Sequence, residues 1–356
     1  MKIAVDAMGG DFGPEKIISG AIDFARETRI GVVLVGKEDA VRAELDKHAA
    51  GDLPVTVHPA SEVIDMHESP SKASRSKQDA SIVVAMRLVA QGAVDAVVSA
   101  GNSGAVMTSA LRYLGRIHGV YRPAIATVLP TQSGHCMIAD VGANADCKPE
   151  YLLQFGVMAK VAAQTILGIP DPGVGLLSIG EEKGKGNHLT KRAHQLFADS
   201  TEFRFIGNVE GRDIPRGKAD VVVCDGFVGN AILKTMEGTA EVMGRMIKME
   251  IKSSLPAFLG YLFMRPALKR FRKRVDYAEY GGAPLLGVNG ICIICHGKST
   301  PKAIKNALKV AELCVEKRVN EEIAREIRIV SPHGGPASPS SFPNPAPAPA
   351  AGRARR

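Results

Sequence analysis

The chain of 356 residues contains no tryptophan, and aromatic residues make up only 5% of it. Proteins that hold single-stranded nucleic acid stack its bases on aromatic side chains that lie among basic ones. No segment of this sequence interleaves the two in that way. The formal net charge of +8 therefore indicates acidic partners in general, and we expect no nucleic acid among them.

The sequence also lacks an uncharged apolar run of the roughly 20 residues that a membrane span requires. Its first residues, Met1 to Asp6, pass from a short apolar run into an acidic residue and two glycines, which is unlike a signal peptide. We therefore expect a cytoplasmic protein whose contact with the inner face of the cell membrane is peripheral.

Cysteine is scarce, and its six residues lie scattered in apolar runs, as is typical of small buried side chains in a reducing compartment. Cys292, Cys295 and His296 match the pattern of c-type haem attachment. However, residues 290–295 have the composition of a buried strand, and two strand residues three apart point to opposite faces. The pattern therefore predicts packing, and we expect neither a metal site nor a cofactor.

Short β-branched and aliphatic runs alternate with helical patterns along the chain. The predicted strands are 3–5, 32–35, 55–57, 94–98, 125–129, 137–141, 174–179, 204–206, 221–224 and 291–294, and the predicted helices include 150–167 and 230–250. This alternation predicts an α/β fold with a mostly parallel, doubly wound sheet in residues 1–330. Residues 331–356 are rich in proline and alanine and are predicted to form a disordered tail.

Glycine-rich segments follow five of the predicted strands, at 6–13, 100–104, 142–147, 180–187 and 225–230. Ligands of such sheets bind at the carboxyl ends of the strands, so we expect these segments to meet in one cleft.

The segment from Ser99 to Ala105 is the most informative of the five, because a glycine turn leads there from a buried strand into a helix that starts near Ser103. The N–H groups of such a helix start favour an anion. We interpret the segment as a phosphate-binding loop, with turn geometry alone as the alternative.

Residues 255–274 combine apolar and aromatic side chains with a dense basic cluster. The side chains predicted to make contact are Leu255, Phe258, Leu262, Phe263, Arg265, Lys269 and Arg270, within a segment that spans 253–275. This pattern is typical of a helix that lies on an anionic membrane. Contact with an acidic protein partner and a solvated face beside a dimer contact are the alternatives.

Several blocks together resemble one known family. They are Asp6 to Asp11 with Pro14, Ser99 to Ala105, Asp140 to Asn144 with Asp146, Gly175 to Leu177, Lys185 to Asn187, Phe205 to Glu210, Asp225 to Asn230 and Tyr280 to Pro284. In this order they resemble the bacterial acyl-carrier-protein:phosphate acyltransferases of phospholipid synthesis, from Met1 to about Val330. The chain departs from the family pattern at Ala80, where a serine is expected, and Ser103 replaces the usual threonine.

The resemblance implies transfer of a long acyl chain from acyl carrier protein to inorganic phosphate. The acyl phosphate would serve the membrane glycerol-3-phosphate acyltransferase. It also implies a homodimer with a fold similar to isocitrate and isopropylmalate dehydrogenases and to phosphotransacetylase.

Phosphate would then already carry the nucleophilic oxygen, so the site must position it and stabilise the oxyanion. We expect phosphate at Ser99, Gly101, Asn102, Ser103 and Gly104, with Lys185 as a cationic clamp and Asn230 as an amide donor. Further cleft candidates are Asp6, Asp11, Lys77, Asn144, Asp146 and Asp225.

Three other functions compete with this one. A nicotinamide-dependent dehydrogenase is disfavoured because the chain has no dinucleotide fingerprint. A phosphotransacetylase acting on coenzyme A thioesters shares the reaction type and stays open. A scaffold that positions acyl carrier protein at a membrane is motivated by residues 255–274.

Overall fold

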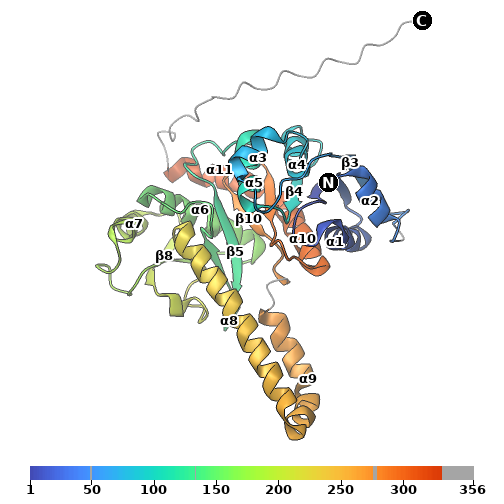
Figure 1. Cartoon of the computed structure of the whole chain (residues 1–356). Helices are drawn as coiled ribbons and strands as arrows, with labels where there is room; N and C mark the ends of the chain where they lie inside the picture. The colour runs from blue at the N-terminus through green and yellow to red at the C-terminus, as the bar shows by residue number, and fades with distance from the viewer. Residues whose placement is uncertain (49, 133, 276–278, 331–356) are drawn as a thin grey trace, which may run out of the picture.

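The computed structural model describes residues 1–48, 50–132, 134–275 and 279–330, without the side chains of 272–275, so the predicted tail at 331–356 lies outside the described residues. One 11-stranded sheet runs in the order β3-β2-β1-β4-β11-β10-β5-β6-β9-β7-β8 (Figure 1). Its strands are β1 (Lys2–Asp6), β2 (Gly31–Gly36), β3 (Val55–Pro59), β4 (Ala96–Ser99), β5 (Ala124–Pro130), β6 (His135–Ala139), β7 (Gly173–Leu177), β8 (Arg204–Val209), β9 (Val221–Val223), β10 (Ala283–Leu286) and β11 (Ile291–Ile294). The predicted α/β fold with a mostly parallel sheet is confirmed.

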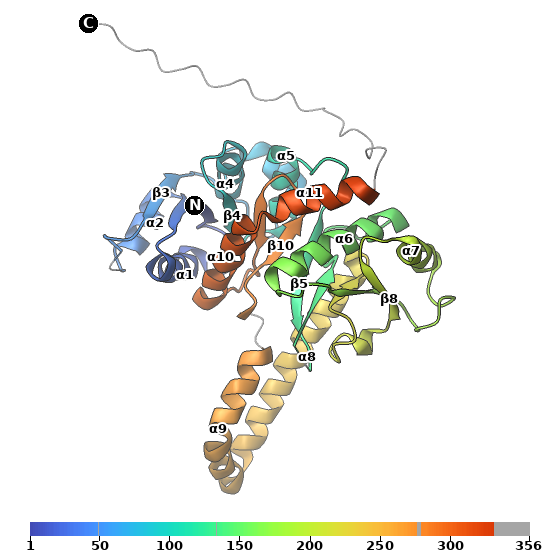
Figure 2. The ribbon, with the colours of Figure 1, turned by 180° about the vertical axis from the view of Figure 1, so that it is seen from behind.

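Helices cover both faces of this sheet, as its two separate groups of buried side chains require (Figures 1 and 2). They are α1 (Gly13–Thr28), α2 (Glu38–Leu45), α3 (Pro70–Ser76), α4 (Ser81–Ala90), α5 (Ser103–Tyr113), α6 (Pro149–Ile166), α7 (His188–Asp199), α8 (Gly226–Ser253), α9 (Leu255–Val275), α10 (Pro301–Glu316) and α11 (Val319–Val330). Side chains of α1, α6, α10 and α11 pack on one face. Those of α3, α4, α5 and the start of α8 pack on the other.

Strand direction changes in the middle of the sheet. The pairs β11–β10, β10–β5 and β5–β6 are antiparallel, whereas the pairs on either side of this centre are parallel. Three reversals leave β6, β9 and β7 running opposite to β1, β4 and β11. The carboxyl ends of these two sets of strands therefore lie at opposite edges, and the sheet alone does not bring all five glycine-rich loops to one edge as expected.

The helices α8 and α9 form a hairpin that projects from the body of the molecule (Figures 1 and 2). The predicted helix over 230–250 is confirmed as the middle of α8, and the predicted contact segment at 253–275 corresponds to α9. None of the helices in the described part of the chain combines the length and the apolar character that a membrane span requires.

The Cys292 to Cys295 segment is a buried strand, as predicted. Both thiols are buried in β11 and its end. Burial raises the pKa of Cys295 to about 12, so this thiol stays protonated and packs as an apolar group.

Candidate active site

The loops after β1 and β4 lock together through Asp6 and Ser99, which are register partners. Ser99 Oγ donates to Asp6 Oδ2 over 2.7 Å and accepts from the Gly101 N–H over 3.1 Å. Asp6 is only 2% exposed, and this burial raises the pKa of its carboxyl against the opposing hydrogen bonds from Ser81 and Ser99. The Ser99 hydroxyl and the Gly101 N–H therefore hold the shape of the loop.

The two loops also touch through their backbones. A Cβ atom at Gly9 would lie 2.7 Å from the Gly101 nitrogen and 2.9 Å from Asp6 Oδ2, so only glycine fits there. The Asp11 N–H donates to the Gly297 carbonyl over 2.8 Å, which adds the loop after β11 to the same cluster. Three strand ends thus form one rigid group, which we call the α5 loop group.

Asn102 caps α5 and ties it to a neighbouring segment. Its Oδ1 accepts from the Ala105 N–H over 3.1 Å, and its Nδ2 donates to the carbonyls of Met66 (3.0 Å), Glu68 (3.3 Å) and Asp65 (3.5 Å). Ser103 follows as the first residue of the helix and is exposed. Within the described residues its hydroxyl has no hydrogen-bond partner, so the first turn of α5 offers Ser103 Oγ and the N–H groups of Ser103 and Gly104 to an anion.

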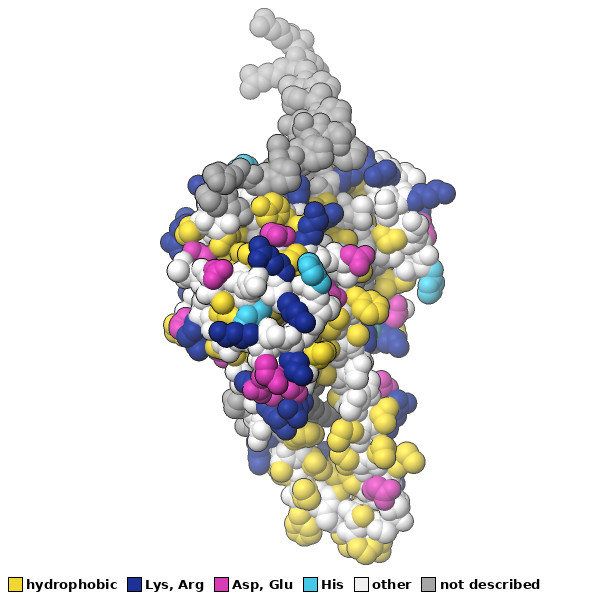
Figure 3. Space-filling view, turned by 90° about the vertical axis from the view of Figure 1, so that its left-hand side faces the viewer, with side chains coloured by type: hydrophobic (Ala, Val, Ile, Leu, Met, Phe, Trp, Pro, Cys, Tyr) yellow, Lys and Arg dark blue, Asp and Glu magenta, His cyan; other side chains and the backbone are white. Residues whose placement is uncertain are grey.

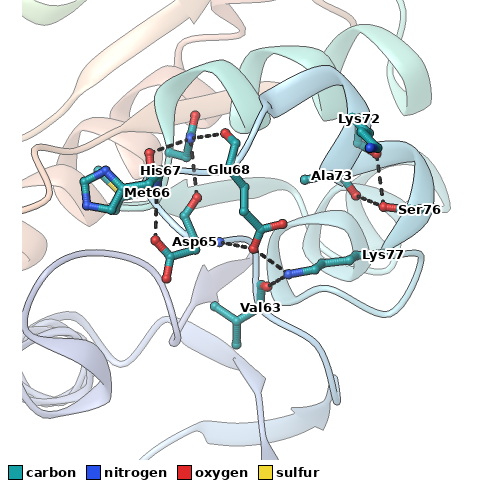
Figure 4. Close-up of polar contacts among 10 residues, drawn as sticks. Val63, Asp65, Met66, His67, Glu68, Lys72, Ala73, Ser76 and Lys77 are labelled. Carbon is teal, nitrogen blue, oxygen red and sulfur yellow. Dashed lines mark hydrogen bonds and ion pairs between the residues drawn. The ribbon is translucent and has the colours of Figure 1, made fainter.

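Lys77 holds the Glu68 end of the segment that Asn102 binds (Figure 4). Its ammonium donates to Glu68 Oε1 over 2.5 Å and to the Val63 carbonyl over 2.8 Å. The hydrogen bond from Lys77 lowers the pKa of the Glu68 carboxyl. Lys77 therefore anchors the segment that Asn102 binds, and its charge is engaged within the protein.

A second group of loops lies at the ends of β6 and β9. Asp140 is fully buried and accepts from the N–H groups of Ile125, Gly142 and Ala143 through Oδ1 and from that of Asn144 through Oδ2. Burial raises the pKa of Asp140, and these hydrogen bonds oppose the rise. Sequence reasoning did not name Asp140 as a site residue, although its carboxyl organises the whole loop.

Asn144 links this loop to the start of α8. Its Nδ2 donates to the Pro123 carbonyl over 2.8 Å and to Asp140 Oδ2 over 3.0 Å, while its carbonyl accepts from the Gly226 N–H over 2.8 Å. Asp225 caps α8 by accepting from the Val228 N–H over 2.9 Å. These contacts fix the first turn of α8, and Asn230 follows it in the second turn and is exposed.

Asn230 lies above the Asp140 loop. A Cβ atom at Gly142 would come within 3.9 Å of Asn230 Cβ, and one at Gly229 would lie 1.9 Å from the Asp140 carbonyl oxygen. The close approach of α8 to the loop therefore depends on Gly229. Its backbone contact places Asn230 at the surface with its amide available to a ligand.

Lys185 is exposed in the loop between β7 and α7. Its side-chain stem lies against Gly180, where a Cβ atom would be 2.9 Å from Lys185 Cγ. The loop is held by Asn208, whose Nδ2 donates to the Glu182 carbonyl over 3.0 Å, and by Asn187, which caps α7. Asp146 is also exposed, at the end of the Asp140 loop.

The helix α8 connects the two groups. Lys234 and Glu237 of α8 are close enough to His296 for their charges to affect the pKa of that imidazole, as is Asp11 of the α5 loop group. The pKa of His296 is lowered, first by burial and then by Lys234. Asn230 and Lys234 are four residues apart and so lie on the same side of α8.

Most of the predicted site residues thus fall into two sets. Asp6, Asp11, Ser99, Gly101, Asn102, Ser103, Gly104 and Lys77 belong to the α5 loop group or its support, and Asn144, Asp225 and Asn230 surround the start of α8. No hydrogen bond or ion pair among the described residues joins Lys185 to either set. Sequence reasoning missed Lys234, because only the path of α8 across the sheet brings that lysine to the α5 loop group.

Comparisons with known proteins identify the family of the chain. The model of the fatty acid synthesis protein family matches residues 1–322. A phosphate acyltransferase of Trichlorobacter lovleyi is 52% identical over 327 residues, which cover 92% of this chain and 94% of that protein. The chain belongs to the fatty acid synthesis protein family. A phosphate acyltransferase of Pelotomaculum thermopropionicum is 53% identical over 334 residues, 94% of this chain and 97% of that one.

Solved structures show the same fold at low identity. A phosphotransacetylase from Streptococcus pyogenes superposes with a TM-score of 0.59 at 18% identity, over 89% of this chain and 94% of that one. The EutD phosphotransacetylase from Staphylococcus aureus gives 0.56 at 15% identity, over 88% and 94%. The predicted phosphotransacetylase fold is confirmed, and the likeness to isocitrate and isopropylmalate dehydrogenases stays a prediction.

Proposed function

We propose that this member of the phosphate acyltransferase family transfers a long-chain acyl group from acyl carrier protein to inorganic phosphate. The acyl phosphate would then supply the membrane glycerol-3-phosphate acyltransferase of phospholipid synthesis. The observation that carries the proposal is the open first turn of α5, which ends a rigid loop group and offers donors to an anion. Relatives named phosphate acyltransferase over more than nine-tenths of the chain support the same chemistry.

The reaction requires the enzyme to position phosphate against the thioester carbonyl, and it does not require an acyl-enzyme intermediate. A phosphate oxygen attacks the thioester carbonyl carbon, so that a C–O bond forms and the carbonyl becomes an oxyanion. The oxyanion then collapses, the C–S bond breaks, and the carrier thiolate leaves with the bonding electron pair. The proton of the attacking hydrogen phosphate is transferred to this thiolate, which leaves acyl phosphate and free thiol.

In this proposal the phosphate binds Ser103 Oγ and the N–H groups of Ser103 and Gly104. Asp6, Ser99, Gly101 and Asn102 act by holding that turn in shape, and Lys77 acts through Glu68. Lys185 supplies a cation, and the Asn230 amide donates to the phosphate or to the oxyanion. Asp225 and Asn144 position Asn230, while Asp11 and Asp146 line the approach.

The α8–α9 hairpin is proposed to contact an anionic membrane surface. Large apolar side chains are exposed over it, with Phe263 at 87%, and they gather on the projecting part of the molecule (Figure 3). The basic side chains of Arg265, Lys269 and Arg270 follow on α9. Apolar anchors beside a basic cluster favour an anionic lipid surface. We further propose a cytoplasmic homodimer that associates peripherally with the membrane.

The decisive experiment incubates the enzyme with palmitoyl-acyl carrier protein, with and without inorganic phosphate, and follows acyl phosphate by mass spectrometry. We expect acyl phosphate and free acyl carrier protein only when phosphate is present. Palmitoyl-coenzyme A is run alongside, and a preference for it would assign the enzyme to coenzyme A thioesters instead. No product from either thioester would refute the proposed reaction and favour a scaffold.

A further inference from the structure

Two large apolar side chains beside the candidate catalytic residues are exposed to solvent. Ile179, just after β7, is 81% exposed, and Phe227, in the first turn of α8, is 71% exposed. Ile179 lies outside the α8–α9 hairpin, and Phe227 lies at the start of α8, at the opposite end of that helix from α9 and from the apolar side chains of the proposed membrane contact. Large apolar side chains that gather on a surface mark a binding site.

The sheet places these two side chains at the same edge. The strands β7 and β9 are parallel neighbours, with Leu176 paired to Val223, so the segments that follow them leave the sheet side by side. Ile179 precedes Gly180, against which the stem of Lys185 lies. An exposed apolar side chain therefore stands next to the proposed cationic clamp.

One stripe of α8 also places an apolar side chain close to polar and cationic ones. Phe227, Asn230 and Lys234 are spaced i, i+3 and i+7, and all three are exposed. The opposite stripe is formed by Gly229, Leu233 and Met236, which face the sheet or the side chains packed on it. Along the outer stripe the order is aromatic ring, amide and ammonium, and the ammonium lies towards His296 and the α5 loop group.

We propose that Phe227 and Ile179 form the surface that binds the part of the acyl group's alkyl chain that lies beyond the reach of a butyryl group. The inference rests on the proposed function, since an acyl thioester must present an alkyl chain, a carbonyl and an incoming phosphate in that order. The outer stripe of α8 presents an apolar ring, an amide donor and a cation in the same order. Burial of apolar surface then makes Phe227 and Ile179 determinants of acyl-chain selectivity.

The test compares butyryl- and palmitoyl-acyl carrier protein as substrates of the full-length enzyme at saturating phosphate. In Phe227→Ala and Ile179→Ala we expect kcat/KM for the palmitoyl thioester to fall about tenfold, as the loss of about two methylene-sized contacts predicts. For the butyryl thioester we expect less than a twofold change. Phe227→Leu keeps an apolar side chain and should restore most of the preference for the long chain.

The matched control is Ile329→Ala on α11, which removes an exposed isoleucine (59%) that does not belong to the proposed surface. This variant should change kcat/KM for neither substrate. Equal losses for both thioesters, together with a smaller mass in sedimentation, would overturn the inference and assign the surface to a contact between two copies. Unchanged selectivity in both alanine variants would also overturn it. If the wild-type enzyme makes no acyl phosphate from either thioester, the proposed function fails, and the inference fails with it.

Discussion

Asn102 is the residue whose removal tests how the phosphate loop is held. Asn102→Ala deletes the cap of α5, which is typically worth about 1 kcal/mol. It also deletes the 3.0 Å hydrogen bond from Nδ2 to the Met66 carbonyl, worth about 1 kcal/mol, whereas the contacts at 3.3 and 3.5 Å add little. We expect a loss of about 2 kcal/mol in the free energy of unfolding, measured by urea denaturation, and a raised KM for phosphate.

Two further variants separate the terms of that estimate. Asn102→Asp keeps the oxygen that caps α5 but replaces the donor that faces three carbonyls, so it should lose at least about 1 kcal/mol. Asn320→Ala removes one amide-to-carbonyl bond of 3.0 Å, to Val288, and should lose about 1 kcal/mol without changing the KM for phosphate. A loss below about 0.5 kcal/mol in Asn102→Ala would refute the assigned contacts. A full loss with an unchanged KM would refute the link to phosphate.

Three more perturbations test other parts of the molecule. Lys185→Ala and Asn230→Ala should each lower kcat at least about 100-fold while the melting temperature stays within a few degrees, because both residues are exposed; near-normal turnover in both would reject their roles. The pKa of the His296 imidazole, measured by NMR, should lie below its ordinary value of 6.5, so its contribution to stability is present above pH 6.5 and is lost as the pH falls through the lowered pKa. Lys234→Met removes a charge that lowers this pKa and should therefore raise it. An unchanged pKa in Lys234→Met would show that α8 does not face His296. Serine at Leu255, Phe258, Leu262 and Phe263 together should abolish co-sedimentation with anionic vesicles and leave turnover of dissolved acyl carrier protein thioester unchanged, whereas retained binding would exclude this surface.

The fold was predictable where a local pattern specifies it. The run before Ser99, the glycines after it and the polar residue at 102 together predict a strand, a turn and a helix start, and the structure has α5 begin at Ser103. The strand at 291–294 was predictable from its composition in the same way. Its burial on both faces explains why its two cysteines serve packing.

The arrangement of the site was less predictable, because it depends on strand direction. The strands at 124–130 and 135–139 pair antiparallel, and β10 lies in a short segment that sequence reasoning did not identify. Each reversal moves the following loops to the other edge of the sheet. Lys77 shows a second limit, since nothing in its local sequence indicates that its ammonium binds Glu68, nine residues earlier, and the Val63 carbonyl.

The length of α8 sets the scale on which the enzyme and a lipid surface would meet. From Asn230 to Ser253 the helix runs without interruption, and the 23 steps from one residue to the next correspond to about 35 Å at the rise of an α-helix. A surface touched only by the hairpin tip lies at that distance from the amide of Asn230. Under the proposed function, the acyl phosphate would form away from the lipid, and its delivery would require either a tilt of the whole body about the tip or a protein that collects the product above the membrane.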